Sequence, residues 1–239
     1  MKKKGIALVE RQYLFPFVLI TSLFFLWGFA HAILDVLNKH FQELLTITRT
    51  HSAMIQATMY MGYFIMAIPA GLFINRHGYR KGVVLGLLLY GIGSLLFIPG
   101  QYIASFNMFL FSLFVIGCGL TFLETAANPY VTELGARETA ASRLNFAQSF
   151  NGLGCIFAPI LTGLLLFSDE DKGASGNVAL PYAVMGVIVL LAALAFMRVR
   201  LPEIPHEEEV DSEGHHVGLW THKLFVFGLV ALFAYEVSE

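Results

Sequence analysis

Two acidic side chains, Asp35 and Glu124, stand inside long apolar runs of the sequence. A carboxyl group at the centre of a bilayer costs at least about 2.5 to 3.5 kcal/mol on insertion scales, so it is expected to face a protein interior or a water-filled cavity. Removal from water disfavours the charged form, which suits a group that takes up and releases a proton. We therefore expect Asp35 and Glu124 to be proton-coupling residues. The alternative is a structural carboxylic acid that is hydrogen-bonded to a neighbouring helix.

Two amide side chains, Gln148 and Asn151, are expected at a depth similar to that of Glu124. Counted at 1.5 Å per residue from the inner ends of their helices, Glu124 lies about 10 Å deep, Gln148 about 7 Å and Asn151 about 12 Å. Residues three apart project from one helix face. Amides supply hydrogen-bond donors and acceptors together, which suits a polyhydroxylated ligand. The alternative is that these amides only bond to neighbouring helices.

Three further side chains surround Asp35 along the same apolar run. His31 lies one turn earlier on the same face, and Asn38 lies three residues later. An aspartate and a histidine at this spacing can relay a proton. Trp27 lies mid-helix, where an indole can stack on a sugar ring. Plain packing within the membrane is the alternative for His31 and for Trp27.

The elements that must carry these residues are apolar runs long enough to cross a membrane. Of the 239 residues, 56% are hydrophobic and 13% charged, against about 25% charged in a typical soluble domain. This composition excludes an ordinary soluble protein. A spanning helix needs about 20 mostly apolar residues. Six runs are suitable, namely Leu14 to Phe41, Ser52 to Ile74, Gly82 to Pro99, Asn107 to Val131, Leu144 to Phe167 and Leu180 to Met197.

These runs divide the chain into four parts. The sequence predicts an all-α multi-pass membrane protein with a short N-terminal segment over 1–13 and a six-helix bundle over 14–199. An acidic stretch over 200–222 is expected to be a linker. The last apolar run, Leu224 to Tyr235, has 12 residues, too few to cross, so 223–239 is predicted to begin an incomplete seventh helix.

The basic residues indicate the orientation. With the N-terminus in the cytoplasm, all of the 15 basic residues except Lys39, Arg49 and Lys172 lie on the cytoplasmic side. The positive-inside rule therefore places 1–13 and 200–222 in the cytoplasm. A signal peptide is the competing interpretation of the first helix, because Lys2 to Lys4 precede an apolar run. Its removal would delete one span and invert the charge pattern, so it is not favoured.

Several other functions have no support in the sequence. The net charge is −2 and no extended basic face occurs, so no nucleic-acid partner is expected. Cys118 and Cys155 lie in apolar runs, where a cysteine is usually a small core residue. His215 and His216 lie beside carboxylates but are interpreted as a solvated loop rather than a metal site. No serine-hydrolase, zinc-protease or phosphate-loop motif appears, so we expect neither an enzyme nor a cofactor.

A weak internal repeat connects the two halves of the bundle. Ser22-Leu23-Phe24 precedes Asp35 much as Ser112-Leu113-Phe114 precedes Glu124. The second pair of echoes is Gln56 before Pro69 and Gln148 before Pro159. The common offset corresponds to three helices, so the second copy must cross the membrane in the opposite sense. Inverted three-helix repeats are typical of secondary transporters, whose sites form near the midplane.

Glycine and alanine spaced four residues apart predict close helix packing. Such pairs occur at Ala67 and Gly71, at Gly82 and Gly86, and at Gly154 and Ala158. Small residues at this spacing permit helix backbones to approach closely in a membrane.

Three segments resemble the fucose:proton symporter group of the major facilitator superfamily. They are Leu23-Phe24-Phe25-Leu26-Trp27-Gly28, the stretch from Leu123 to Val131 with Glu124-Thr125-Ala126-Ala127-Asn128-Pro129, and the stretch from Arg143 to Asn151. The resemblance implies two six-helix bundles with a sugar site between them, alternating access, and uptake of a hexose with a proton across the cell inner membrane. It identifies Glu124 with the protonatable glutamate of the family and Asp35 with its second carboxylate. Gln148 and Asn151 fall where the family has polar groups lining the sugar cavity.

The chain departs from the family pattern in three places. His31-Ala32-Ile33-Leu34 stands where the fucose member of the family has asparagines, which bears on the identity of the sugar. The predicted gating loop, with Arg76, Gly78, Arg80 and Lys81, carries Asn75 where the superfamily usually has an aspartate. Family members have twelve helices, so a C-terminal half is expected as a partner, in cis or in trans.

The leading hypothesis from the sequence is the N-terminal half of a hexose:proton symporter in the lipid bilayer. Asp35 and Glu124 would carry the proton, and the sugar would bind at Gln148 and Asn151. The alternatives are a non-transporting sugar receptor or assembly partner built on the same bundle, and a non-functional truncated fragment.

Overall fold

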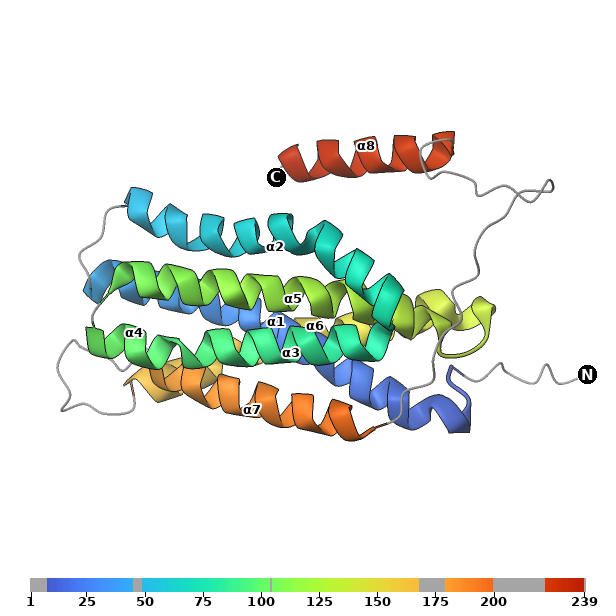
Figure 1. Cartoon of the computed structure of the whole chain (residues 1–239), viewed down its shortest axis with the longest axis horizontal. Coiled ribbons are helices and arrows are strands. Elements are labelled where there is room, and N and C mark those ends of the chain that lie inside the picture. Colours follow the sequence, from blue (N-terminus) through green and yellow to red (C-terminus); the bar gives the residue numbers. More distant parts are fainter. Residues whose placement is uncertain (1–7, 45–48, 104, 168–178, 200–221, 239) are drawn as a thin grey trace, which may run out of the picture. The chain divides into compact units, whose positions relative to one another are not determined.

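The computed structural model describes residues 8–44, 49–103, 105–167, 179–199 and 222–238, and no β-strand occurs among them. Side chains near some helix ends, that of Asn38 among them, lie outside this description. The helices (Figure 1) are α1 (Leu14–Leu44), α2 (Arg49–His77), α3 (Tyr79–Leu95), α4 (Phe97–Ile103), α5 (Phe106–Glu133), α6 (Ala140–Phe167), α7 (Ala179–Arg198) and α8 (Lys223–Ser238). Two short 3₁₀ turns, Arg11–Tyr13 and Arg137–Thr139, precede α1 and α6.

The helices coincide with the predicted apolar runs, which confirms the all-α fold class. Within the described residues, five segments have the length and composition to cross a membrane: Arg11–Val36, Ala53–His77, Tyr79–Ile103, Phe106–Glu133 and Ala179–Arg198. The predicted run from Leu144 to Phe167 lies within α6, which has 28 residues. The third predicted span differs, because a turn at Leu96 divides it into α3 and α4. The arrangement as two inverted three-helix repeats stays a prediction.

The chain up to Ile204 forms one compact unit, and residues from Pro205 onward form another. The predicted linker over 200–222, with His215 and His216, lies outside the described residues apart from His222. In the second unit, the predicted start of a seventh helix corresponds to α8, which has 16 residues.

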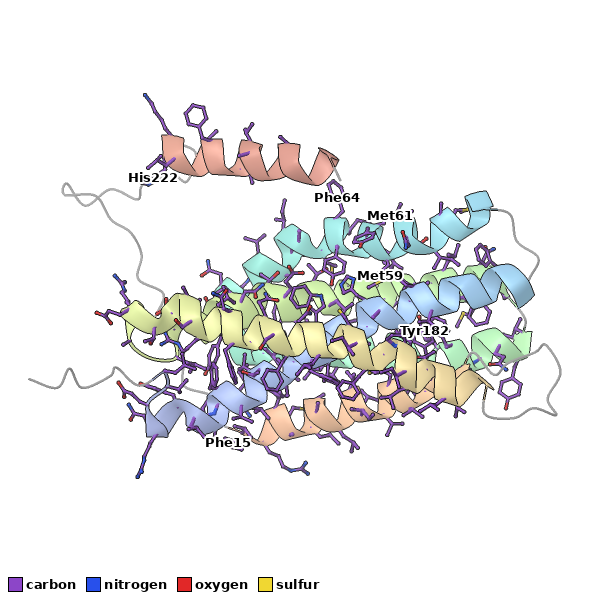
Figure 2. The ribbon with its side chains drawn as sticks, turned by 180° about the vertical axis from the view of Figure 1, so that it is seen from behind. Phe15, Met59, Met61, Phe64, Tyr182 and His222 are labelled. Carbon is purple, nitrogen blue, oxygen red and sulfur yellow. The ribbon has the colours of Figure 1, made fainter. Side chains whose placement is uncertain are left out.

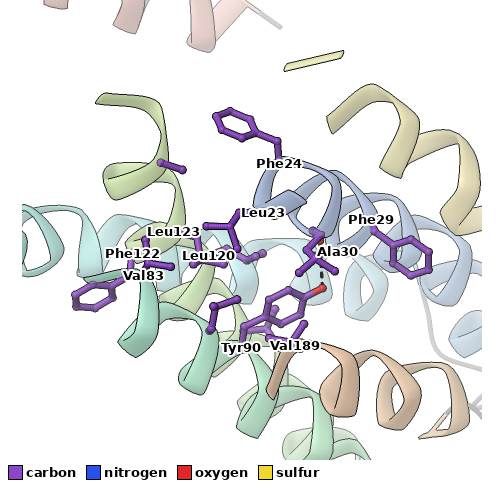
Figure 3. Packing of buried hydrophobic residues seen from close by; sticks show 14 of the residues in the cluster. Leu23, Phe24, Phe29, Ala30, Val83, Tyr90, Leu120, Phe122, Leu123 and Val189 are labelled. Carbon is purple, nitrogen blue, oxygen red and sulfur yellow. Dashed lines mark hydrogen bonds between the residues drawn. The ribbon is translucent and has the colours of Figure 1, made fainter. Parts of the chain in front are cut away.

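Within the first unit, α5 packs against α2 and α3, α1 packs against α6, and α3 packs against α7 (Figure 1). The core between them is apolar and rich in leucine and phenylalanine (Figure 3). Tyr90 of α3 is buried in this core, and its hydroxyl donates a hydrogen bond of 3.3 Å to the carbonyl oxygen of Leu26 on α1. A buried hydroxyl is costly without a partner, so this bond satisfies Tyr90 and links α3 to α1.

The outer surface of the first unit is also apolar, as a membrane protein requires. On α2, Met59 is buried, whereas Met61 and Phe64 are exposed, with Phe64 at 84% (Figure 2). On α6, Ile156, Ile160 and Leu164 are exposed in the same way. Large apolar surfaces of this kind are rare on soluble monomers and mark contact with lipid or with another protein.

Helix backbones lie in close contact at several glycines, which have no side chain to hold the helices apart. A β-carbon at Gly28 of α1 would lie 2.1 Å from the carbonyl oxygen of Asn151, and one at Gly154 of α6 would lie 2.3 Å from that of Phe25. The α3–α5 contact is similar, because a β-carbon at Gly86 would lie 2.8 Å from the carbonyl oxygen of Gly119. The predicted close approach is thus confirmed at Gly86 and Gly154. It is wrong at Gly71, which has no described atom within 4 Å of a β-carbon placed there.

We expect Gly28→Ala to destabilise the bundle, because the methyl group would overlap the α6 backbone. Overpacking of this kind costs about 1 to 3 kcal/mol. The effect is measured as a lower midpoint of SDS-induced unfolding, followed by circular dichroism in mixed micelles. Gly152→Ala is the matched control, because a β-carbon at Gly152 meets no atom within 4 Å among the described residues. Equal midpoints for the two variants would contradict the close contact between α1 and α6.

Candidate functional site

A shallow pocket between α1 and α5 contains one of the two predicted carboxyl groups. It is lined by Leu23, Phe24 and Trp27 from α1 and by Leu123, Glu124, Ala127 and Asn128 from α5. Glu124 is half-buried, and its pocket neighbours are apolar apart from the indole N–H of Trp27 and the amide of Asn128. The pocket therefore places one ionisable group among mostly apolar walls.

Both predicted amides lie at the border of this pocket. Gln148 Nε2 donates to Asn128 Oδ1 at 3.5 Å, and Asn151 Nδ2 donates to the carbonyl oxygen of Phe24 at 3.3 Å. Asn128 and Phe24 both line the pocket that holds Glu124. The structure thus brings Glu124, Gln148 and Asn151 to one region, as the depth count predicts. Each amide has two hydrogens and an acceptor oxygen, so it keeps capacity for a ligand.

Trp27 and His31 are joined by a residue that the sequence analysis missed, Tyr63 of α2. Trp27 Nε1 donates to the Tyr63 hydroxyl at 3.0 Å, and His31 Nε2 lies 3.0 Å from the same oxygen. The Trp27 and His31 rings meet edge to face, with centroids 6.1 Å apart. Tyr60 adds ring contacts of 6.5 Å with His31 and 6.3 Å with Tyr63.

The pattern of α2 contained a signal for Tyr63. Gln56, Tyr60 and Tyr63 are spaced by four and three residues, which places them on one helix face. All three contact the predicted residues of α1. A polar and aromatic stripe within an apolar helix could therefore have identified the facing surface.

Asp35 does not lie in the pocket of Glu124. Its carboxylate is exposed and accepts a hydrogen bond of 3.3 Å from Gln56 Nε2. It lies within electrostatic range of His31 and of the Tyr182 hydroxyl on α7. Among the described residues, Trp27, Tyr63 and His31 lie between the two carboxyl groups. The side chain of Asn38, predicted to lie nearby, is outside the described residues.

The predicted gating loop is the turn between α2 and α3. Gly78 has a φ of +87°, a conformation that residues with a side chain rarely adopt. Arg76 and Lys81 are exposed. Arg80 Nε donates to the carbonyl oxygen of Phe196 at 3.2 Å, and Arg80 Nη2 donates to that of Met197. Arg80 therefore binds the last turn of α7, where a cation also complements the helix dipole.

A second arginine, Arg143, joins the end of α5 to the start of α6. Its side chain is fully buried. Its guanidinium donates to the carbonyl oxygens of Leu8, Val131, Thr132 and Ala136 and to the hydroxyl of Thr139. No role of its own was predicted for Arg143 from the sequence. It fixes the two helices that carry Glu124 and Gln148, because a buried guanidinium needs several acceptors at once.

The described residues contain no group of three or more metal-ligating side chains, and Cys118 and Cys155 are free thiols. Cys118 is buried, as a core cysteine is expected to be, whereas Cys155 is exposed. Cys155 Sγ lies 3.4 Å from the carbonyl oxygen of Gly28, at the contact between α1 and α6.

Comparison with known proteins identifies similar sequences and structures. A family model described as Major Facilitator Superfamily matches residues 17–237. The chain is 36% identical over 234 residues to a glucose/galactose transporter of Brucella abortus, covering 96% of this chain and 57% of that protein. It is 37% identical over 223 residues to the L-fucose-proton symporter of Escherichia coli, covering 85% of this chain and 51% of that protein. The chain therefore spans about half the length of the curated relatives that it matches.

Solved structures share the fold. The crystal structure of a Major Facilitator Superfamily transporter, FucP, in the outward conformation is 35% identical, with a TM-score of 0.69 over 92% of this chain and 56% of that chain. The D-xylose-proton symporter is 16% identical, with a TM-score of 0.69 over 94% of this chain, and shows the fold alone. These relatives are transporters, which points away from an enzyme.

We expect Arg80→Met to loosen the end of α7, because the carbonyl groups of Phe196 and Met197 lose a charged donor. If the free energy of local opening at the end of α7 falls by about 1 kcal/mol, backbone amides of the last turns exchange roughly fivefold faster. Hydrogen exchange with mass spectrometry on the chain in nanodiscs measures it. Lys81→Met removes the neighbouring exposed cation and should leave this exchange unchanged. Similar exchange in both variants would contradict the role of Arg80.

Proposed function

The chain belongs to the Major Facilitator Superfamily, and we propose that it forms the N-terminal half of a proton-coupled hexose symporter. The observation that carries the proposal is the pocket between α1 and α5, which is lined by a carboxyl group, an indole and the amide of Asn128, and whose lining residues bond to Gln148 and Asn151. The names of the similar proteins, glucose/galactose transporter and L-fucose-proton symporter, indicate the same chemistry.

In this proposal Glu124 is the main proton-coupling residue. Its half-buried position among apolar walls makes the negative charge costly, so protonation and loss of the proton change the local electrostatics strongly. Asp35 is the second coupling residue, supported by its bond to Gln56 and its proximity to His31. Its exposed position suits exchange of a proton with the aqueous phase.

Gln148 and Asn151 bind hydroxyl groups of the hexose, and Trp27 stacks on its apolar face. The position of both amides at the border of the pocket supports this assignment. An aromatic ring fixed through its polar edge leaves its face available, and the Trp27 N–H is held by Tyr63. His31 and Asn38 are further proposed sugar contacts.

A second half, in cis or in trans, completes the cavity, and rocking of the two halves exposes it to each side in turn. The loop with Arg76, Gly78, Arg80 and Lys81 lies at the cytoplasmic end and takes part in gating. The contact of Arg80 with α7 supports this, because it ties the loop to a neighbouring helix. The N-terminus and the 200–222 linker are proposed to lie on the cytoplasmic side of the cell inner membrane.

We expect Glu124→Gln to abolish accumulation of hexose driven by a pH gradient, by at least about tenfold, while exchange of sugar is kept. The amide preserves the shape of the side chain but does not ionise. The assay is uptake of labelled fucose, galactose and glucose into proteoliposomes, with the chain completed by a C-terminal half. Glu133→Gln, at the exposed end of the same helix, is the matched control and should transport normally.

Accumulation that remains pH-dependent in Glu124→Gln would contradict the assignment of Glu124. Binding of a hexose without flux in the completed protein would instead favour a non-transporting sugar receptor.

The proposed topology predicts opposite results for reporters in two loops. Alkaline phosphatase is active only outside the cytoplasm, so a fusion after residue 172 should be active and one after residue 212 inactive. Green fluorescent protein, which folds in the cytoplasm, should give the reverse pattern. Phosphatase activity after residue 212 would overturn the orientation derived from the basic residues.

A further inference from the structure

The Tyr63 hydroxyl stands between two side chains of α1 and bonds to both. Trp27 Nε1 and His31 Nε2 each lie 3.0 Å from it. All three residues are half-buried, and Tyr63 comes from a different helix, α2. One hydroxyl oxygen is therefore shared by the indole that lines the Glu124 pocket and the imidazole beside Asp35.

The donor inventory fixes the direction of the bond with Trp27, whereas the direction of the bond with His31 depends on the tautomer of the imidazole. An indole N–H only donates, so the Tyr63 oxygen accepts from Trp27. The single hydroxyl hydrogen of Tyr63 is then free to donate to His31, which requires Nε2 to be unprotonated. Neutral His31 then carries its hydrogen on Nδ1, and only in this tautomer does protonation of His31 reverse the bond.

Protonation of His31 reverses one of these bonds. Both nitrogens of an imidazolium are donors, so Nε2–H then donates to the Tyr63 oxygen. That oxygen accepts two hydrogen bonds, from Trp27 and from His31, and the hydroxyl hydrogen must turn to another acceptor. Glu124 lines the same pocket as Trp27, which bonds to that hydroxyl, and the charge of Glu124 acts on Tyr63. A negative charge on that side favours this rotation of the hydroxyl hydrogen.

We propose that Tyr63 is a positioning residue whose hydroxyl couples the protonation of His31 to the state of Glu124. The inference deepens the proposed function and rests on it, because it joins the proton-coupling residue of the pocket to the pair formed by His31 and Asp35. Tyr63 itself neither gains nor loses a proton in this scheme. Its hydrogen changes acceptor when His31 changes charge.

Other ionisable groups surround His31 and must be considered in any titration. Those that face this region are Asp35 on the same helix, Tyr60 and Tyr63 on α2, Glu124 on α5, Cys155 on α6, Tyr90 on α3 and Tyr182 on α7. A phenol and a thiol ordinarily lose their protons only at alkaline pH. The carboxyl groups of Asp35 and Glu124 are therefore the groups to separate from His31 by substitution.

The experiment uses Trp27 as a probe of His31 in the 239-residue chain in nanodiscs. Trp220→Phe leaves Trp27 as the sole tryptophan. An imidazolium quenches indole emission at short range, and the two ring centroids are 6.1 Å apart. We expect a one-proton step in Trp27 emission as the pH falls, and we expect His31→Gln to abolish it. A step that persists in His31→Gln, or no step at all, overturns the proposal.

The coupling is measured as a double-mutant cycle on the midpoint of this step. Glu124→Gln should move the midpoint by about 0.5 pH unit or more. In the Tyr63→Phe background, the same Glu124→Gln substitution should leave the midpoint unchanged. The Tyr60→Phe background keeps the bridging hydroxyl of Tyr63 and removes the hydroxyl of a neighbouring ring. In this background the shift should remain. A shift that persists in Tyr63→Phe is due to direct interaction between His31 and Glu124 and overturns the role of Tyr63.

A second measurement does not depend on the folding of any Tyr63 variant. Nitrogen-15 shifts of labelled His31, assigned by difference from His31→Gln, report which ring nitrogen is protonated. We expect hydrogen on Nδ1 and none on Nε2 at the alkaline end of the titration. The opposite tautomer would overturn the proposal. Neither readout requires sugar or a C-terminal half, so failure of this coupling and failure of the transport proposal are separate results.

Discussion

The backbone contact between α1 and α6 determines where the side chains of the candidate site lie. Gly28 and Gly154 let each helix press against a carbonyl group of the other. Trp27 precedes Gly28, and Asn151 lies three residues before Gly154, so both side chains are placed at the border of one pocket. A larger residue at either glycine would push the helices apart and remove the Asn151 amide from the carbonyl oxygen of Phe24. The polar groups therefore depend on a contact made without any side chain.

The other wall of the pocket belongs to α5, which is held at its end by the buried Arg143. A membrane-embedded carboxyl group is costly, and none of the residues that line the pocket of Glu124 is a cation. Arg143 satisfies carbonyl groups at the end of α5 and reaches the turn before α6. The buried Arg143 bonds to the end of α5 and is not among the residues that line the pocket of Glu124. Gain or loss of the proton on Glu124 therefore changes the net charge of the pocket lining.

Much of the fold was predictable because each membrane span corresponds to one continuous apolar segment of the sequence. Length and hydropathy located the helices, and a rise of 1.5 Å per residue placed Glu124, Gln148 and Asn151 at similar depth. Contacts between helices depend on rotation about each helix axis, which the chain does not state locally. The bridging role of Tyr63 and the tie from Arg80 to α7 were therefore missed, as was the turn at Leu96. The small residue Gly71 was assigned a close contact that the described residues do not make, for the same reason.

The hydrogen bond from Arg143 to the carbonyl oxygen of Leu8 joins residues 135 positions apart. During synthesis, Leu8 leaves the ribosome long before Arg143 exists. This hydrogen bond therefore forms only after α5 and the start of α6 have been synthesised. Until Arg143 is synthesised, water must hydrate the carbonyl groups at the end of α5 that later accept its hydrogen bonds. This end of the bundle is thus completed late in biogenesis, and Leu8 is among the last residues to be fixed.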